Sequence, residues 1–173
     1  MSIEKIKQAV RDIPDFPKLG IVFKDITPVL HDPELFAQTI KIFAEKYRGT
    51  PITRIAGIDA RGFIFGAALA YELGLGFIPI RKKGKLPHDA YEVSYDLEYG
   101  TSTIEMHTDA VEEGDRVLIV DDLLATGGTA RAAADLIEKS GGTVEALAFL
   151  VELGFLKGRA QLDGYHIFVP ITY

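Results

Sequence analysis

The chain has 173 residues, 47% of them hydrophobic, which suits one globular domain with a substantial buried core. We therefore predict a single domain over residues 1–173. Its 25 acidic residues outnumber 19 lysine and arginine residues, and the net charge of −6 argues against a general nucleic-acid-binding surface. An anionic ligand must be held by local groups, and the absence of cysteine excludes disulfides and thiolate metal sites.

No stretch approaches the roughly 20 consecutive apolar residues that a membrane span requires, and the first residues lack the apolar centre of a secretion signal. We expect no membrane partner, no nucleic-acid partner and a cytoplasmic location. The histidines also lack metal-ligand spacing; they are His31, His88, His107 and His166.

The N-terminal part is predicted to be mainly helical. Apolar residues at positions 3, 6, 10 and 13 predict an amphipathic helix that stops at Pro14. A loop punctuated by prolines follows over residues 14–30. Asp32 and Pro33 resemble an N-cap and a first helical residue, and the apolar stripe after them predicts a core-packing helix that ends at Gly49.

The rest of the chain alternates between predicted strands and helices. Residues 52–80 read as strand, helix and strand, the length of a β-α-β crossover, and the pattern starts again at residues 117–120. Residues 166–171 predict a last strand, and alternation around Gly100 predicts a β-hairpin over residues 91–111. We expect an α/β fold with a doubly wound parallel sheet flanked by helices, to which the N-terminal helical segment and a protruding hairpin are added.

The stretch "VLIVDDLLATGGTA", residues 117–130, combines a buried strand, two acids and a glycine-rich turn into a helix. Gly127 and Gly128 let successive backbone N–H groups and the helix start face an anion, and Thr126 and Thr129 add hydroxyl donors. Ligands of open α/β sheets bind at this end of the strands. The competing interpretation is a strand-to-helix turn in which Asp121 or Thr129 acts only as a cap.

Asp121 and Asp122 would repel a phosphate unless they address another part of the ligand. A sugar satisfies this condition, because its hydroxyls donate to carboxylates while its phosphate lies among the amides. The same acids help to hold Mg²⁺ through water. The motif therefore predicts a ribose 5-phosphate site. The chain has no Walker A sequence, no dinucleotide fingerprint and no G-x-S-x-G or H-E-x-x-H motif.

Together with this stretch, five further segments resemble the adenine phosphoribosyltransferase family of type I phosphoribosyltransferases, in the same order and over nearly the whole chain. They are "VFKDITPVL" (22–30), "GIDARGFIFG" (57–66), "IRKKGKLP" (80–87), "LEYGTSTIEM" (97–106) and "LVELGFLKGR" (150–159). The resemblance implies the type I phosphoribosyltransferase fold with a flexible hairpin hood. It also implies a homodimer that uses Mg²⁺ to convert adenine and phosphoribosyl pyrophosphate into AMP and pyrophosphate, a purine salvage reaction.

The resemblance also implies roles for individual residues. Asp121 and Asp122 are expected to bind the ribose hydroxyls. They are also candidate Mg²⁺ ligands, although the ion is expected to bind mainly through substrate and water. The 5′-phosphate falls to Ala125, Thr126, Gly127, Gly128 and Thr129. The pyrophosphate falls to Asp59, Ala60, Arg61, Arg81, Lys82 and Lys85, with a cis peptide bond after Asp59. A solvated basic loop is the competing interpretation of residues 81–85.

Adenine recognition is assigned by the resemblance to Val22, Phe23 and Lys24, through backbone hydrogen bonds and a ring face. The catalytic residues it implies are Glu98, which handles the base proton, and Arg61 and Arg81, which stabilise the leaving group. Tyr95 and Tyr99 are expected to help close segment 82–100 over the site. Without the resemblance, Phe23 reads as a core residue and Glu98 as a solvated hairpin residue.

Two other functions remain open at this point. One is transfer to another purine, such as hypoxanthine or xanthine. The other is a non-catalytic regulator that senses phosphoribosyl pyrophosphate; against it stand Glu98, the net charge of −6 and the lack of an added DNA-binding segment.

Overall fold

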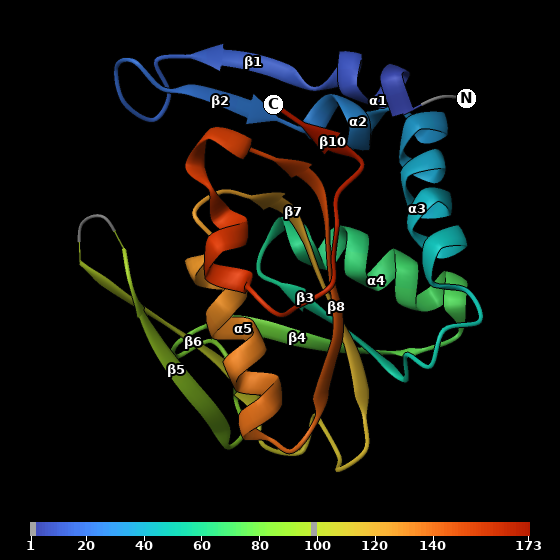
Figure 1. The fold of residues 1–173 in the computed structure, drawn as a ribbon, viewed down its shortest axis with the longest axis vertical. Coiled ribbons are helices and arrows are strands. Elements are labelled where there is room, and N and C mark those ends of the chain that lie inside the picture. The colour runs from blue at the N-terminus through green and yellow to red at the C-terminus, as the bar shows by residue number, and fades with distance from the viewer. Residues whose placement is uncertain (1–2, 98–99) are drawn as a thin grey trace. The chain divides into compact units, whose positions relative to one another are not determined.

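The computed structural model describes residues 3–97 and 100–173 (Figure 1). The chain divides into two compact units, Met1–Lys46 and Tyr47–Tyr173. The expectation of one domain over the whole chain stays a prediction. Among the described residues, no helix has the length and apolar character needed to cross a membrane.

The first unit is built around helices and one small hairpin. Its elements are α1 (Ile3–Ala9), β1 (Arg11–Pro14), β2 (Val22–Asp25), α2 (Thr27–His31) and α3, which runs over Pro33–Tyr47. The predicted start of α3 is confirmed: Asp32 Oδ1 accepts hydrogen bonds from the backbone N–H groups of Glu34 and Leu35 at 2.9 and 3.0 Å. This is the N-cap geometry that satisfies otherwise unpaired donors of a first helical turn.

The expectation of one helix up to Pro14, followed by a loop, is wrong. Helix α1 ends at Ala9, and β1 pairs antiparallel with β2. Charges of opposite sign face each other in that pairing, with Arg11–Asp25 at 2.6 Å and Lys24–Asp12 at 2.5 Å. Such cross-strand pairs stabilise a short two-stranded ribbon. This pairing takes residues 11–14 out of the helix that the apolar spacing at positions 3, 6, 10 and 13 predicts.

The second unit contains a mixed eight-stranded sheet. Its strands are β3 (Arg54–Ile58), β4 (Gly76–Lys82), β5 (Ala90–Asp96), β6 (Thr101–His107), β7 (Arg116–Leu124), β8 (Thr143–Glu152), β9 (Ile167–Phe168) and β10 (Ile171–Thr172). The order is β10-β8-β7-β3-β4-β6-β5, and β9 also pairs with β8. Strands β10, β9, β8, β7, β3 and β4 pair in parallel, whereas β6 pairs antiparallel with both β4 and β5.

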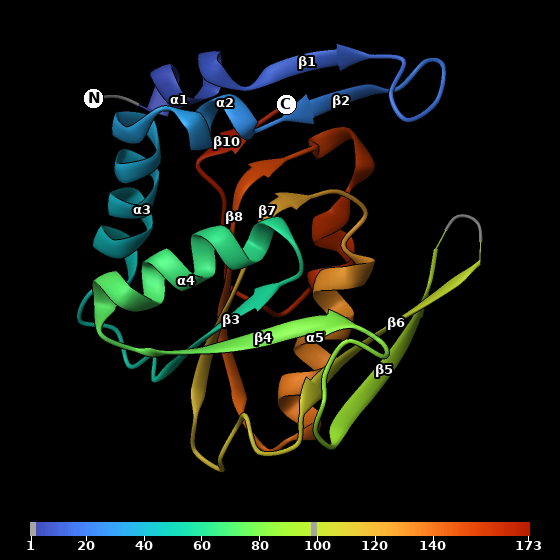
Figure 2. The same ribbon diagram turned by 180° about the vertical axis from the view of Figure 1, so that it is seen from behind.

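Helices cover both faces of this sheet, as the doubly wound pattern predicts. Helix α5 (Gly128–Lys139) lies in front of the strands in Figure 1, and α4 (Arg61–Leu73) lies in front in the reverse view of Figure 2. Two short 3-10 helices, η1 (Gly154–Leu156) and η2 (Gly158–Leu162), follow β8. The predicted crossover and hairpin are confirmed, while the predicted last strand is divided into β9 and β10.

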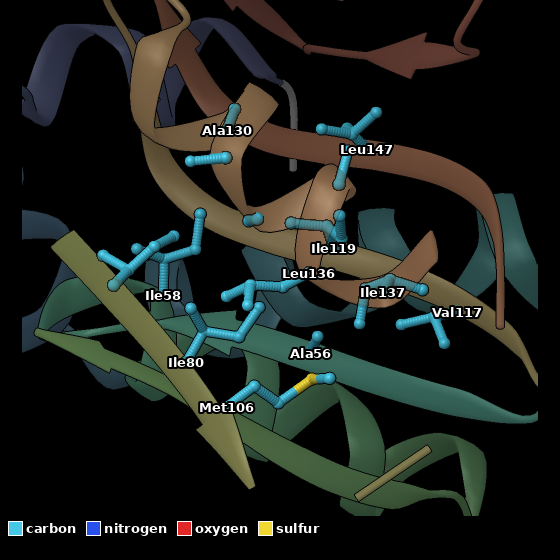
Figure 3. Close-up of a cluster of buried hydrophobic side chains, with 14 of the residues drawn as sticks. Ala56, Ile58, Ile80, Met106, Val117, Ile119, Ala130, Leu136, Ile137 and Leu147 are labelled. Atoms are coloured by element: carbon cyan, nitrogen blue, oxygen red, sulfur yellow. The ribbon is translucent and has the colours of Figure 1, made fainter. Parts of the chain in front are cut away.

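The core between α5 and the sheet fixes where the strands end. Figure 3 shows side chains from three parallel strands meeting those of the helix, among them Ile58 of β3, Ile80 of β4, Ile119 of β7 and Leu136 of α5. Each of these four is at most 4% exposed. Since both faces are covered, the middle of each central strand is a run of mainly apolar residues rather than an alternation, as in 117–120 of β7. Burial of this cluster holds the carboxyl ends of β3, β4 and β7 beside one another.

Helix α4 begins unusually close to β7, and Gly62 makes the approach possible. A Cβ atom at Gly62 would lie 2.8 Å from the Val120 carbonyl oxygen and 2.9 Å from Asp121 Oδ1. No side chain fits there without a shift of the backbone.

We expect Gly62→Ala to lower the free energy of unfolding by about 1–3 kcal/mol, because the added methyl group overpacks a backbone contact. In an open helix the same substitution would stabilise by about 1 kcal/mol. Urea unfolding of both proteins distinguishes the two cases, and a more stable variant would contradict the close packing of α4 on β7.

Candidate active site

A cavity of about 350 Å³ lies at the carboxyl ends of β3, β4 and β7, and the β5–β6 hairpin contributes to its wall. Its lining residues are Ile58, Asp59, Ala60, Arg61, Ile80, Arg81, Lys82, Tyr95, Leu97, Ser102, Ile104, Asp121, Asp122 and Thr129. Nine of these were singled out from the sequence, from four separate segments. The position agrees with the general rule for ligand sites in open α/β sheets.

The glycine-rich loop after β7 lines a second, smaller cavity of about 90 Å³. Asp121 and Thr129 border both cavities, and Ala125, Thr126 and Gly127 border the smaller one. Gly127 has φ of +88°, and α5 begins directly after it at Gly128. The loop therefore presents the start of a helix to the cavity, a favourable place for a phosphate.

A segment after β8 supports this loop from the outside. A Cβ atom at Gly127 would collide with the carbonyl oxygen of Gly158, and one at Gly158 with that of Ala125. The segment is itself held by Glu152, whose side chain is 8% exposed and pairs with Arg159 at 2.9 Å. Glu152, Gly158 and Arg159 belong to the stretch 150–159, which resembles the family in sequence. The sequence did not indicate that this stretch packs against the glycine-rich loop.

The two acids lie inside β7 and not after it, which corrects the expectation of a strand limited to residues 117–120. Strand β7 continues to Leu124, and Asp121 pairs in register with Phe149 of β8. The backbone N–H of Asp122 donates to Asp121 Oδ1 at 2.8 Å. Burial, and then the neighbouring Asp122 carboxylate, raise the pKa of Asp121 well above its ordinary value of 3.8, although Arg61 opposes the shift.

Two arginines of the cavity pair with carboxylates of the same cavity. Arg61 Nε lies 2.5 Å from Asp122 Oδ2, and Arg81 Nε lies 2.9 Å from Asp59 Oδ2. The arginine side chains are 44% and 33% exposed, so solvent screens both pairs. The peptide bond between Asp59 and Ala60 is cis, as the resemblance implies.

The basic segment after β4 is only partly in the cavity. Lys82 belongs to its lining, whereas Lys85 does not. The carbonyl oxygen of Lys85 accepts a hydrogen bond from Arg81 Nη1 at 3.4 Å. The backbone N–H of Lys85 donates to Glu105, a buried acid that sequence reasoning did not single out.

The hairpin is joined to the glycine-rich loop after β7 by a pair of hydroxyl groups. Thr129 Oγ1 donates to the Tyr95 hydroxyl at 3.0 Å, which links β5 to the first turn of α5. Glu98 and Tyr99 lie outside the described residues, so their predicted roles stay predictions.

The proposed adenine-binding residues form β2 of the first unit. Val22 is 47% exposed, and the Phe23 ring meets Phe16 edge-on at 5.3 Å between centroids. Lys24 pairs with Asp12. The role of this strand in base recognition stays a prediction.

The chain is similar to known proteins of one enzyme class. Residues 26–163 match the family model described as the phosphoribosyl transferase domain. The chain is 56% identical over 173 residues to an adenine phosphoribosyltransferase of Thermoanaerobacter sp. (strain X514), which covers all of both chains. A crystal structure of the adenine phosphoribosyltransferase from Thermoanaerobacter pseudethanolicus is similar at a TM-score of 0.97 with 55% identity, over 99% of this chain and 100% of that one.

A more distant structure is equally informative. The Saccharomyces cerevisiae adenine phosphoribosyltransferase, complexed with an imino-altritol bisphosphate and adenine, matches at a TM-score of 0.93 and 40% identity, over 97% of each chain. The fold is therefore that of the type I phosphoribosyltransferases. Within that class, the chain belongs to the adenine phosphoribosyltransferase family.

The raised pKa of Asp121 predicts a pH-dependent cost to stability. Between 3.8 and the raised native value, the folded state binds more protons than the unfolded state, so stability falls as the pH rises. Asp121→Asn removes this ionisation. We expect Asp121→Asn to have a higher free energy of unfolding than the wild-type protein at neutral pH. The difference between the two free energies should shrink towards zero as the pH falls to about 3.8. Urea unfolding over this range measures it, and a difference that does not change with pH would contradict the assignment.

Proposed function

We propose that the protein transfers the 5-phosphoribosyl group of phosphoribosyl pyrophosphate to adenine, giving AMP and pyrophosphate. The observation that carries the proposal is the cavity that Asp121, Asp122, Arg61 and Arg81 line together, beside the glycine-rich loop at the start of α5. Membership of the adenine phosphoribosyltransferase family supports the reaction, and the yeast relative is described with adenine bound.

The sugar phosphate is proposed to bind across the two cavities. Its 5′-phosphate takes the loop of residues 125–129, and its hydroxyls donate to Asp121 and Asp122. The shared border of the two cavities at Asp121 and Thr129 supports the binding of one ligand across both. A phosphate and a sugar are thus required together, which explains the presence of acids in an anion site.

The leaving group is proposed to bind to the cations of the same cavity. Pyrophosphate oxygens replace Asp122 on Arg61 and Asp59 on Arg81, and Lys82 adds a third charge. Guanidinium groups suit this exchange because they bind two phosphate oxygens at once. Stabilising the departing charge favours displacement at C1′ with inversion, through a state of ribosyl-cation character.

The base is proposed to be recognised by the backbone around Val22 and Lys24 and by the ring of Phe23. Glu98 is proposed to accept or share the proton of the purine ring as the new bond forms. Tyr95 and Tyr99 help the hairpin to exclude water, which would otherwise hydrolyse the ribosyl cation. The Tyr95–Thr129 hydrogen bond supports such a role, because it already joins hairpin and phosphate loop.

Magnesium is proposed as the cofactor. Among the described residues, no group of three or more His, Cys, Asp and Glu side chains is placed to hold a metal ion. The carboxylates of Asp121 and Asp122 nevertheless fit a hard cation, if substrate oxygens and water complete its shell. When bound, the ion neutralises charge on the pyrophosphate.

A homodimer is also proposed. Its support is the outer face of α4, where Ile64 and Tyr71 are 40% and 89% exposed and lie two helical turns apart. Two exposed apolar side chains on one helix face offer a surface that a second copy of the chain could cover. The cytoplasmic location stays a prediction.

We expect the pure protein to convert labelled adenine far better than hypoxanthine, xanthine or guanine when each is supplied with phosphoribosyl pyrophosphate and Mg²⁺. Glu98→Gln should lower kcat roughly 100-fold or more, the usual effect of removing a general acid or base. Product analysis by chromatography measures both. Faster conversion of another base would contradict adenine as the preferred substrate. No turnover of any base would favour a non-catalytic sensor of phosphoribosyl pyrophosphate. Full activity of Glu98→Gln would contradict the role of Glu98 in the mechanism.

A further inference from the structure

A buried acid outside the cavity lining organises the basic segment. Glu105, in β6, is 5% exposed. Its Oε1 atom accepts hydrogen bonds from three consecutive backbone N–H groups, those of Gly84 and Lys85 at 3.1 Å and that of Leu86 at 2.9 Å. Three donors on one oxygen compensate a charge that would otherwise be costly to bury.

These three N–H groups form the kind of concave cradle that binds anions in other proteins. Gly84 has φ of +86°, which allows the chain to turn so that the donors converge. The cradle is filled by the protein's own carboxylate and is therefore not a phosphate site. None of residues 84–86 lines the cavity, so the loop acts on it through Arg81, whose Nη1 donates to the carbonyl oxygen of Lys85.

Hydrogen bonds of Arg81 and Lys83 also connect this loop to β4 and β6. Arg81 is the register partner of Glu105 in the β4–β6 ladder, and its Nη1 donates to the carbonyl oxygen of Lys85. Further along, the Lys83 N–H donates to the carbonyl oxygen of Thr103 at 3.0 Å. Glu105 is thus the buried point at which the loop, Arg81 and the hairpin strand are joined.

We propose that Glu105 is a positioning residue for the pyrophosphate-binding cations. It holds residues 84–86 against β6, so that Arg81 and Lys82 lie at the cavity. This inference rests on the proposed function, since it assumes that these cations bind the pyrophosphate group. It predicts a specific defect: loss of Glu105 weakens ligands that carry a pyrophosphate, and spares a ligand such as AMP that has the sugar, the 5′-phosphate and the base alone.

Two variants separate the hydrogen bonds from the packing. Glu105→Met keeps a similar volume without an acceptor, and Glu105→Gln keeps an acceptor oxygen without the charge. The matched control is Glu92→Gln. Glu92 is the β5 register partner of Glu105 and carries the same charge, but it is more exposed and pairs with Lys83 at 2.8 Å.

The measurement is the affinity for phosphoribosyl pyrophosphate and for AMP, by titration calorimetry. We expect Glu105→Met to weaken phosphoribosyl pyrophosphate about tenfold or more, corresponding to about 1.4 kcal/mol. Glu105→Gln should recover part of this loss, because a neutral acceptor makes hydrogen bonds about half as strong. AMP affinity should change about twofold or less in both variants, and Glu92→Gln should leave both affinities within about twofold.

Equal weakening of both ligands would show that Glu105 acts only through the general fold, and unchanged affinities would remove its role. If the methionine variant does not fold, Glu105→Gln decides alone, and unchanged affinity for phosphoribosyl pyrophosphate would then overturn the proposal. Failure of the wild-type protein to use adenine would contradict the proposed function without affecting this binding comparison.

Discussion

The pairing of arginines with carboxylates inside one cavity is the constraint on which the site depends. A chain of net charge −6 offers a polyanionic ligand no general attraction, so the cations that would bind it must be local and held in position. Arg61 and Arg81 meet this condition because Asp122 and Asp59 hold them in place. The guanidinium groups are 44% and 33% exposed, and under the proposed function they exchange these carboxylates for ligand oxygens.

The fold supplies the rigid frame for this exchange. The core beneath α5 aligns the ends of β3, β4 and β7, so residues distant in the sequence become neighbours. Gly62 lets α4 approach β7, which brings Arg61 within reach of Asp122. Gly158 packs closely against the glycine-rich loop after β7, and the Glu152–Arg159 pair holds the segment that carries Gly158. The charged and polar groups that line the two cavities are then carried by strand ends and short loops, while rigid elements set the distances between them.

Much of this frame was predictable from the sequence, because apolar periodicity and glycine-rich turns are local signals. The β-α-β crossover, the hairpin and the N-cap at Asp32 are examples. The first helix was predicted too long, since the strand pairing of Arg11 with Asp25 is a contact between separated residues that periodicity does not record. The same reason explains why Glu105 was missed: its importance lies in backbone donors about twenty positions away, and a lone glutamate in a β-strand carries no sign of them. The roles of the two acids of β7 stay predictions, and the pairing of Asp122 with Arg61 was not visible in the sequence.

The central claim is that Asp122 pairs with Arg61 until the ligand binds. The sugar hydroxyls then donate to the Asp122 carboxylate, and the phosphate oxygens accept from the Arg61 guanidinium. Calorimetric titration of the wild-type protein and Asp122→Asn with pyrophosphate and with ribose 5-phosphate tests it directly, with Asp135→Asn as a control that removes a similar charge from an exposed pair with Arg131. The account predicts opposite changes: Asp122→Asn should bind ribose 5-phosphate more weakly, because a hydroxyl partner is lost, and pyrophosphate more tightly, because Arg61 no longer has to leave a carboxylate. Weaker binding of both ligands, or no change in either, would contradict it.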